Sequence, residues 1–257
     1  MSKSSARKPA GKAPAEPIAI PRTTKRNSVQ QVALGDDEAG NGLWPSDGVV
    51  FDRTCTDCPR LVAFLEEGRK QHPDYYCAPV APFGDRRARL IIVGLAPGFH
   101  GANATGRPFT GDYAGELLYK TLYKYGFANK PESVHRNDGL KLLGARITNS
   151  VKCVPPDNKP LPIEITTCNR YLQAELAIAP KNAVLLALGS IGHNACLRAL
   201  GLKVGEYKFG HAAEFKLPGG QTLIDSYHCS RYNTNTRRLT EEMFEAVFAR
   251  ARKLVSQ

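Results

Sequence analysis

The sequence lacks any apolar run approaching the roughly 18–20 residues that span a bilayer, and its first residues lack the apolar core of a secretory signal. Acidic residues are scarce, with 24 Asp and Glu against 35 Lys and Arg, so the formal net charge is +11. We therefore expect an intracellular protein with no membrane segment and a polyanionic partner, of which nucleic acid is the commonest. Charge that serves only solubility is the alternative.

Residues 1–45 form a stretch rich in Lys, Ala, Pro, Ser and Gly with no lasting periodicity. Residues 1–30 alone hold seven Lys and Arg against the single acid Glu16. We predict a disordered basic arm over 1–45, followed by one domain over 46–257. An organelle transit peptide is the alternative, although Pro9, Pro14, Pro17 and Pro21 disfavour the amphipathic helix that it would need.

Short apolar runs alternate with helical spacing from about residue 50 onward. The strand candidates are residues 89–95, 146–151, 183–188 and 221–227, and the helix candidates are residues 114–125, 162–179, 191–200 and 238–254. Strands that are apolar along their whole length belong to a mostly parallel sheet covered on both faces. The sequence therefore predicts an α/β domain, with any site at the carboxyl ends of the strands.

Seven cysteines in an intracellular chain are unsuited to a disulfide framework. Cys55 and Cys58 form a CxxC pair, and Cys153 and Cys168 lie far downstream. Four cysteine ligands without a matching histidine suit either an iron–sulfur cluster or an all-cysteine zinc site. On the residues alone these two alternatives stay open.

Two polar segments and one amide fall where predicted strands end. A glycine-rich loop runs from Gly94 to Asp112, and it is neither a GxGxxG motif nor a P-loop. His228 follows the last predicted strand and opens a loop rich in Asn, Thr and Arg, while Asn149 ends the second strand. Such loops suit phosphate contacts and a base wedge. A tight turn and a structural histidine are the non-functional alternatives.

The segments GLAPGFHGANATGRPFTGD, ITNSVKCVPPDNKP and HCSRYNTNTRRLT, together with the four cysteines, resemble the motifs of family 5 (UDGb-type) uracil-DNA glycosylases. The resemblance runs from about residue 55 to 254 in the expected order. It implies a three-layer α/β/α sandwich with a central four-stranded parallel sheet. It also implies a structural [4Fe–4S] cluster on Cys55, Cys58, Cys153 and Cys168, and a substrate of DNA that contains uracil or related damaged bases. We expect a monomer in the bacterial cytoplasm, associated with the nucleoid.

The resemblance also assigns roles to residues of the motifs. Hydrolysis of an N-glycosidic bond requires an extruded base, a stabilised anionic leaving group and a positioned water. Asn149 reads the base edge, His228 donates to the base oxygen, and Asp112 orients water or stabilises the cationic sugar. The other implied contacts to the base are Ala96, Phe99, His100 and Phe109, and the implied contacts to DNA are Arg231, Tyr232, Arg237 and Arg238.

Three positions bear on these roles. Leu95 stands where many members of the wider superfamily place a carboxylate or Asn, so Asp112 must take over that role or catalysis relies mainly on stabilising the leaving group. Phe99 and Cys229 depart from the usual family residues. Asp112 also precedes a predicted helix, where an N-cap is the alternative role.

A catalytically weak or inactive Fe–S protein that binds DNA is the competing function for the whole protein, and an electron-transfer protein is a third.

Overall fold

The computed structural model describes residues 51–256, and the basic arm predicted for residues 1–45 lies outside this range. Four buried parallel strands form the centre of the sheet in the order β3 (Ala145–Asn149), β2 (Leu90–Gly94), β4 (Val184–Leu188) and β6 (Thr222–Ser226). Every residue of these strands is buried, which explains the continuous apolar runs of β2 and β4. The predicted α/β fold is confirmed.

The sheet has six strands within the described residues, whereas four were predicted. The two additional strands are β1 (Phe83–Gly84), which pairs antiparallel with β3, and β5 (Glu214–Lys216), which pairs antiparallel with β6. Strands of two and three residues at the edges of a sheet are too short to show a periodic pattern. They extend the predicted sheet without changing its class.

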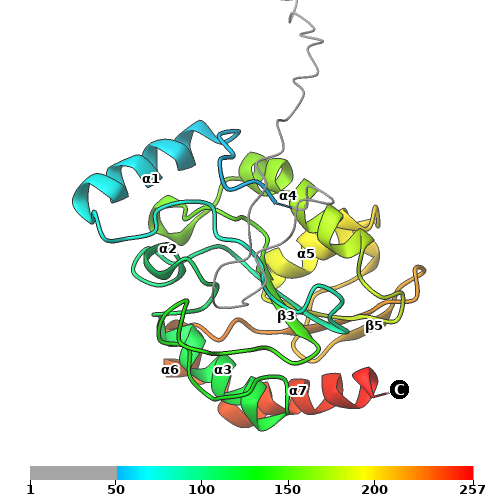
Figure 1. Cartoon of the computed structure of the whole chain (residues 1–257). Coiled ribbons are helices and arrows are strands. Elements are labelled where there is room, and N and C mark those ends of the chain that lie inside the picture. The colour runs from blue at the N-terminus through cyan, green and yellow to red at the C-terminus, as the bar shows by residue number, and fades with distance from the viewer. Residues whose placement is uncertain (1–50, 257) are drawn as a thin grey trace, which may run out of the picture. The chain divides into compact units, whose positions relative to one another are not determined.

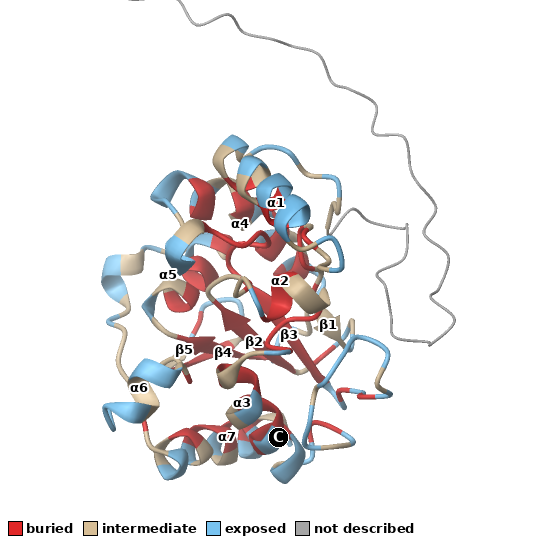
Figure 2. Ribbon diagram, turned by 90° about the vertical axis from the view of Figure 1, so that its left-hand side faces the viewer, coloured by how far each residue is buried: buried red, intermediate tan, exposed pale blue. Residues whose placement is uncertain are grey.

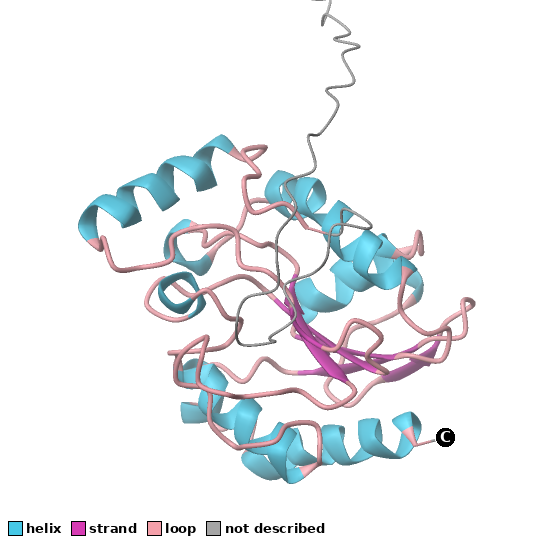
Figure 3. Cartoon of the chain, in the orientation of Figure 1, coloured by secondary structure: helices cyan, strands magenta, loops and turns pink. Residues whose placement is uncertain are grey.

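Helices cover both faces of the sheet (Figures 1 and 3). Helices α3 (Tyr113–Lys124) and α7 (Glu241–Val255) pack on one face, and α4 (Pro162–Ala177) and α5 (Ser190–Ala199) pack on the other. Side chains of β2 alternate between these layers, so that Leu90 and Ile92 join the α3–α7 core while Ile91 and Val93 join the α4–α5 core. Figure 2 shows the buried strands between partly exposed helices.

A further helix, α1 (Pro59–Gln71), packs beside α4 through a third apolar cluster that includes cysteine side chains. The remaining short helices are α2 (Ala102–Thr105), η1 (Pro156–Asn158), η2 (Val204–Glu206) and α6 (Arg231–Asn235). The last helix begins later than the predicted residue 238, because Thr240 caps α7 and Arg237 adopts a left-handed φ of 56°. Among residues 51–256, no helix combines the length and apolarity that crossing a membrane requires.

Candidate active site

A cavity of about 490 Å³ lies at the carboxyl end of the parallel strands. Its lining comes from the segments that follow β2, β3, β4 and β6, which are separate in the sequence. Five of the residues predicted from the sequence line it together: Ala96, Phe109, Asp112, Asn149 and His228. Arg231 also reaches it. The parallel strands thus bring the predicted residues to one place.

The amide of Asn149 points into this cavity from the end of β3. The residue is 4% exposed, and its Oδ1 atom has no hydrogen-bond partner within the described part of the chain. Gly94 makes room for it, because a Cβ atom added there would lie 2.4 Å from Asn149 Oδ1. A buried carbonyl oxygen without a partner is costly, so this atom is suited to receive a donor from a ligand.

Phe109 lines the same cavity as Asn149 and is 5% exposed. Its backbone has a φ of 54°, a left-handed conformation that is uncommon for a bulky residue. The ring centroid lies 5.9 Å from that of His228, and the two planes are inclined by only 26°. Strained residues of this kind persist where the surrounding structure holds them, often at functional sites.

A buried hydrogen-bond network holds the loop of Phe109. Arg107 is 3% exposed, and its guanidinium donates to Asp138 at 2.9 Å and to Ser133 at 2.9 Å. Ser133 also shares a hydrogen bond of 2.6 Å with Thr110. Although burial opposes it, hydrogen bonds from backbone N–H groups and from Arg107 lower the pKa of Asp138 to about 2. The network fixes the glycine-rich loop against residues 133–138.

His228 is a neutral imidazole. Burial lowers its pKa to about 4, and no charged group opposes that effect. Within residues 51–256 the ring nitrogens have no hydrogen-bond partner, whereas the carbonyl of His228 accepts a hydrogen bond from Asn233 at 2.8 Å. A neutral ring can donate one N–H to a ligand without carrying a positive charge.

The two carboxylate oxygens of Asp112 are placed differently. Oδ1 accepts the backbone N–H of Gly115 at 2.9 Å and so caps α3. Oδ2 lies toward Gly101, where an added Cβ would approach it to 2.6 Å. Burial raises the pKa of this carboxyl group, while the backbone hydrogen bonds partly oppose the rise. The cap is therefore observed, and Asp112 also lines the cavity.

A larger cavity of about 1140 Å³ adjoins the first and shares Phe109, Asp112 and Arg231 with it. Phe99 and His100, which were predicted to contact the base, line only this second cavity. The Phe99 ring packs instead in an aromatic group from the end of α1, with its centroid 5.5 Å from that of Phe64 and 5.0 Å from that of His100. The neighbouring Tyr75 hydroxyl bonds His100 Nδ1 at 2.9 Å.

Asn158 lines both cavities and was not singled out from the sequence. It is exposed, and both Asp157 and Asn158 have a left-handed φ of 54°. Arg60 of α1 holds this loop, since its guanidinium donates to the Lys159 carbonyl at 3.1 Å and to both oxygens of Glu164 at 2.8 and 2.7 Å. The signal in the sequence is an Asp and an Asn directly after two prolines, because Asp and Asn tolerate a left-handed backbone in turns.

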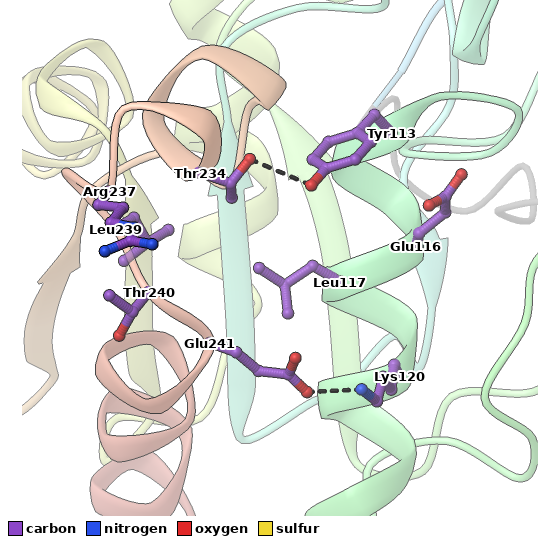
Figure 4. Close-up of a pocket in the computed structure, with 9 residues that line it drawn as sticks. All are labelled: Tyr113, Glu116, Leu117, Lys120, Thr234, Arg237, Leu239, Thr240 and Glu241. Carbon is purple, nitrogen blue, oxygen red and sulfur yellow. Dashed lines mark hydrogen bonds and ion pairs between the residues drawn. The ribbon is translucent and has the colours of Figure 1, made fainter.

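The residues predicted to grip DNA lie around α6. Tyr232 is 71% exposed, and the Arg231 guanidinium lies 5.1 Å from the ring centroid of Tyr113. Arg238 lies 4.7 Å from the ring centroid of Tyr227. Arg237 borders a third cavity, of about 540 Å³, between α3 and the segment that leads into α7 (Figure 4). A hydrogen bond from Thr234 to Tyr113 at 3.2 Å closes one end of it.

Cys229 is fully buried directly after His228. Its thiol donates to the Ala114 carbonyl at 3.4 Å, which ties this loop to the start of α3. The cysteine therefore anchors the segment that carries His228.

All seven cysteines are free, and four of them line one further pocket between α1, α4 and the segment after β3. These are Cys55, Cys58, Cys153 and Cys168. Burial and, to a smaller extent, the neighbouring thiols raise the pKa of Cys58 to about 11. Burial and the other three thiols raise the pKa of Cys153 in the same way. Four thiolates in this pocket would repel one another unless a cation stood between them.

N–H groups surround these sulfurs. The backbone N–H of Lys152 donates to Cys168 Sγ at 3.3 Å, and Arg170 donates to Cys55 Sγ at 3.5 Å. Arg170 also pairs with Asp57. Among residues 51–256, no group of three or more His, Cys, Asp or Glu side chains is arranged to hold a single metal ion.

Comparison with known proteins shows the family to which the chain belongs. The model of the uracil DNA glycosylase superfamily matches residues 81–252. A type-5 uracil-DNA glycosylase from Thermus thermophilus is 48% identical over 205 residues, covering 78% of this chain and 93% of the relative. One from Pyrobaculum aerophilum is 40% identical over 212 residues, covering 81% and 92%. A type-4 uracil-DNA glycosylase from the same organism is 35% identical over 181 residues, covering 68% and 78%.

Proposed function

Because the chain belongs to the uracil DNA glycosylase superfamily, we propose that it hydrolyses the N-glycosidic bond of uracil in DNA and so starts base-excision repair. One observation supports this most strongly. The cavity at the carboxyl end of the sheet brings together the unpartnered amide oxygen of Asn149, the neutral ring of His228 and the ring of Phe109. Deaminated or oxidised bases other than uracil are a further substrate class that we propose for this site.

Recognition of the base rests on Asn149 and Phe109. Uracil presents an N3–H donor beside a carbonyl acceptor, and a carboxamide offers the complementary acceptor and donor. Asn149 Oδ1, which lacks a partner within the described chain, accepts N3–H. Cytosine has no hydrogen at N3, so it cannot make this pair with the amide in the orientation observed. The face of Phe109 stacks on the extruded base, and the neighbouring Ala96 leaves room for it.

Catalysis rests on stabilising the leaving base. As the glycosidic bond breaks, negative charge develops on the base, and the N–H of the neutral His228 ring donates to its O2 atom. Leu95 is apolar and cannot activate water, so that role falls to Asp112. Its Oδ2 atom orients the attacking water or stabilises the cationic sugar, while Oδ1 remains bound to the Gly115 N–H. The helix cap and the catalytic role therefore use different oxygens.

The four-cysteine pocket fits a [4Fe–4S] cluster on Cys55, Cys58, Cys153 and Cys168. Four cysteines without a matching histidine suit either this cluster or an all-cysteine zinc site. The N–H donors from Lys152 and Arg170 are of the kind that support the sulfurs of a cluster, which favours the cluster. Its contribution would be structural, because Cys58 lies at the start of α1, Cys168 lies in α4 and Cys153 lies in the segment that leads to the loop of Asn158.

The exposed side chains around α6 supply the grip on DNA. We assign Arg231, Arg237 and Arg238 to phosphate contacts and Tyr232 to the gap that the extruded base leaves. Phe99 and His100 lie beside the site in the adjoining cavity, where we place the nucleotide next to the extruded one. We also propose that the protein acts as a monomer, and we place this activity in the bacterial cytoplasm at the nucleoid.

The test is strand breakage in oligonucleotides that contain one uracil, after treatment with alkali. Wild-type protein should produce breaks at the uracil only. His228→Ala should lower the single-turnover rate by about 10²–10³-fold and leave DNA affinity unchanged. Asp112→Asn should also lower the rate yet keep the fold stable, because Asn caps a helix as well as Asp does. Intact DNA after incubation with wild-type protein that binds it would favour a non-catalytic binding protein.

A further inference from the structure

A histidine outside the cavity makes a hydrogen bond to the residue that precedes His228. The Nδ1 atom of His211 accepts the backbone N–H of Tyr227 at 3.2 Å. The two rings also stack, with centroids 5.1 Å apart and planes inclined by 28°. We propose that His211 is a positioning residue that fixes where the chain leaves β6 and so aims His228 into the cavity. This inference rests on the proposed function.

His228 needs such support because its own ring is not tethered. Within residues 51–256 neither ring nitrogen has a hydrogen-bond partner, so the backbone and the packing against Phe109 set its direction. Two backbone restraints come from nearby residues in the sequence: Ser226 donates to the Tyr227 carbonyl at 2.9 Å, and Asn233 donates to the His228 carbonyl at 2.8 Å. The bond to His211 connects this segment to a separate part of the chain.

The segment that carries His211 is itself fixed to β6. Ala212 donates to the Asp225 carbonyl at 2.9 Å, and Asp225 donates to the Ala213 carbonyl at 2.9 Å. The Asp225 carboxylate accepts the Gly210 N–H at 3.3 Å and bonds to His193 Nδ1 at 2.8 Å. This Asp225 side chain is fully buried. His211 is therefore a rigid support and not the tip of a free loop.

The protonation state of His211 matches this role. Because Nδ1 accepts a hydrogen bond, it carries no proton, and the ring is the neutral Nε2–H form. Burial lowers the pKa of His211, while a hydrogen bond with the backbone of Met243 partly opposes that effect. On the other side of the stack, the Arg238 guanidinium lies 4.7 Å from the Tyr227 ring centroid. Tyr227 is thus held by its backbone and on its ring.

Two variants separate the hydrogen bond from the stacking. His211→Phe keeps an aromatic ring but removes the acceptor, whereas His211→Asn removes the ring and places Oδ1 where Nδ1 stood. We expect His211→Phe to lower the single-turnover rate on uracil-containing DNA by about tenfold to 10²-fold with an unchanged Kd for DNA. His211→Asn should restore the rate to within about threefold of wild type, since the Tyr227 N–H is again paired.

A wild-type rate in His211→Phe would overturn the proposal, as would an equal loss in both variants that follows their melting temperatures. Nuclear magnetic resonance of the histidine rings gives a second measurement that needs no activity. The ring signals of His228 should shift in His211→Phe and return in His211→Asn. If the wild type released no uracil, the proposed function would fail, while unchanged His228 signals in both variants would refute the positioning role by itself.

Discussion

Replacing Gly94 by alanine tests how closely the parts of the cavity must approach one another. Gly94 is the last residue of β2, and its Cα faces the side chains of Asn149 and Phe109 at close range. An alanine Cβ there would lie 2.4 Å from Asn149 Oδ1 and 2.8 Å from two carbons of the Phe109 ring. Contacts below 3.0 Å are essentially never observed, so at least one of the two side chains must move.

The size of the effect follows from these distances. Restoring ordinary contact at about 3.4–4.0 Å requires the Asn149 oxygen to shift by roughly 1 Å or more. A misplacement of about 1 Å at a reacting group costs up to about 10²-fold in rate. Overpacking a buried site also costs about 1–3 kcal/mol, which lowers the Tm of a domain of this size by several degrees. The protein should therefore remain folded at 25 °C while losing most of its activity.

The assay is single-turnover release of uracil at 25 °C, with the Tm measured on the same preparations. Gly205→Ala is the matched control, because an added Cβ there meets nothing within 4 Å. The control should keep the rate and the Tm of wild type. A Gly94→Ala variant that excises uracil at the wild-type rate would refute the placement of the base between Asn149 and Phe109.

Three further substitutions test the proposed cluster and two buried ion pairs. Cys168→Ser should abolish the broad absorption near about 400 nm and the bound iron of the purified protein, and bound zinc in the wild type would contradict the cluster. Asp138→Asn removes the carboxylate that pairs with the buried Arg107, and it should lower the free energy of unfolding in urea by about 3–5 kcal/mol. Since the pKa of Asp138 is lowered to about 2, the greater stability of the wild type should persist above about pH 4 and be lost as the pH falls from there toward 2. Burial alone would lower the pKa of His193, but its hydrogen bonds to Asp225 and to the Tyr207 carbonyl outweigh burial and raise the pKa. The pair of His193 and Asp225 should therefore stabilise the wild type most below about pH 6.5, and progressively less as the pH rises through the raised pKa of His193. A His193→Gln variant that kept the wild-type dependence of Tm on pH would contradict this assignment.

The parallel core was predictable because each of its strands is buried on both faces. A strand such as β4 is then a continuous apolar run, and its bounds differ from the predicted ones by a single residue. The same topology explains why Asn149 and His228 could be placed together from sequence alone. Parallel strands end at one edge, so residues that follow different strands meet there.

Other features depend on contacts between distant segments and leave no local signal. Arg60 meets Glu164 across 104 residues of sequence, and this pair positions the Asn158 loop at the cavity. Phe99 follows the first strand of the site, yet its ring packs against α1 and lies outside the cavity of Asn149. The positions of the Asn158 loop and of the Phe99 ring both depend on how α1 packs beside the cysteines, and α1 itself was not predicted.

The central claim is that the cavity of Asn149 and His228 cleaves the bond between uracil and its sugar. Its most direct test is the quantity of free uracil released under single-turnover conditions by wild type and by Asn149→Ala, with the Kd for the same DNA measured for both. Wild type should release one equivalent of uracil and leave an abasic strand, and Asn149→Ala should be slower by about 10²-fold or more with similar affinity. Equal release by both proteins, or none by a wild type that binds the DNA, would contradict the claim.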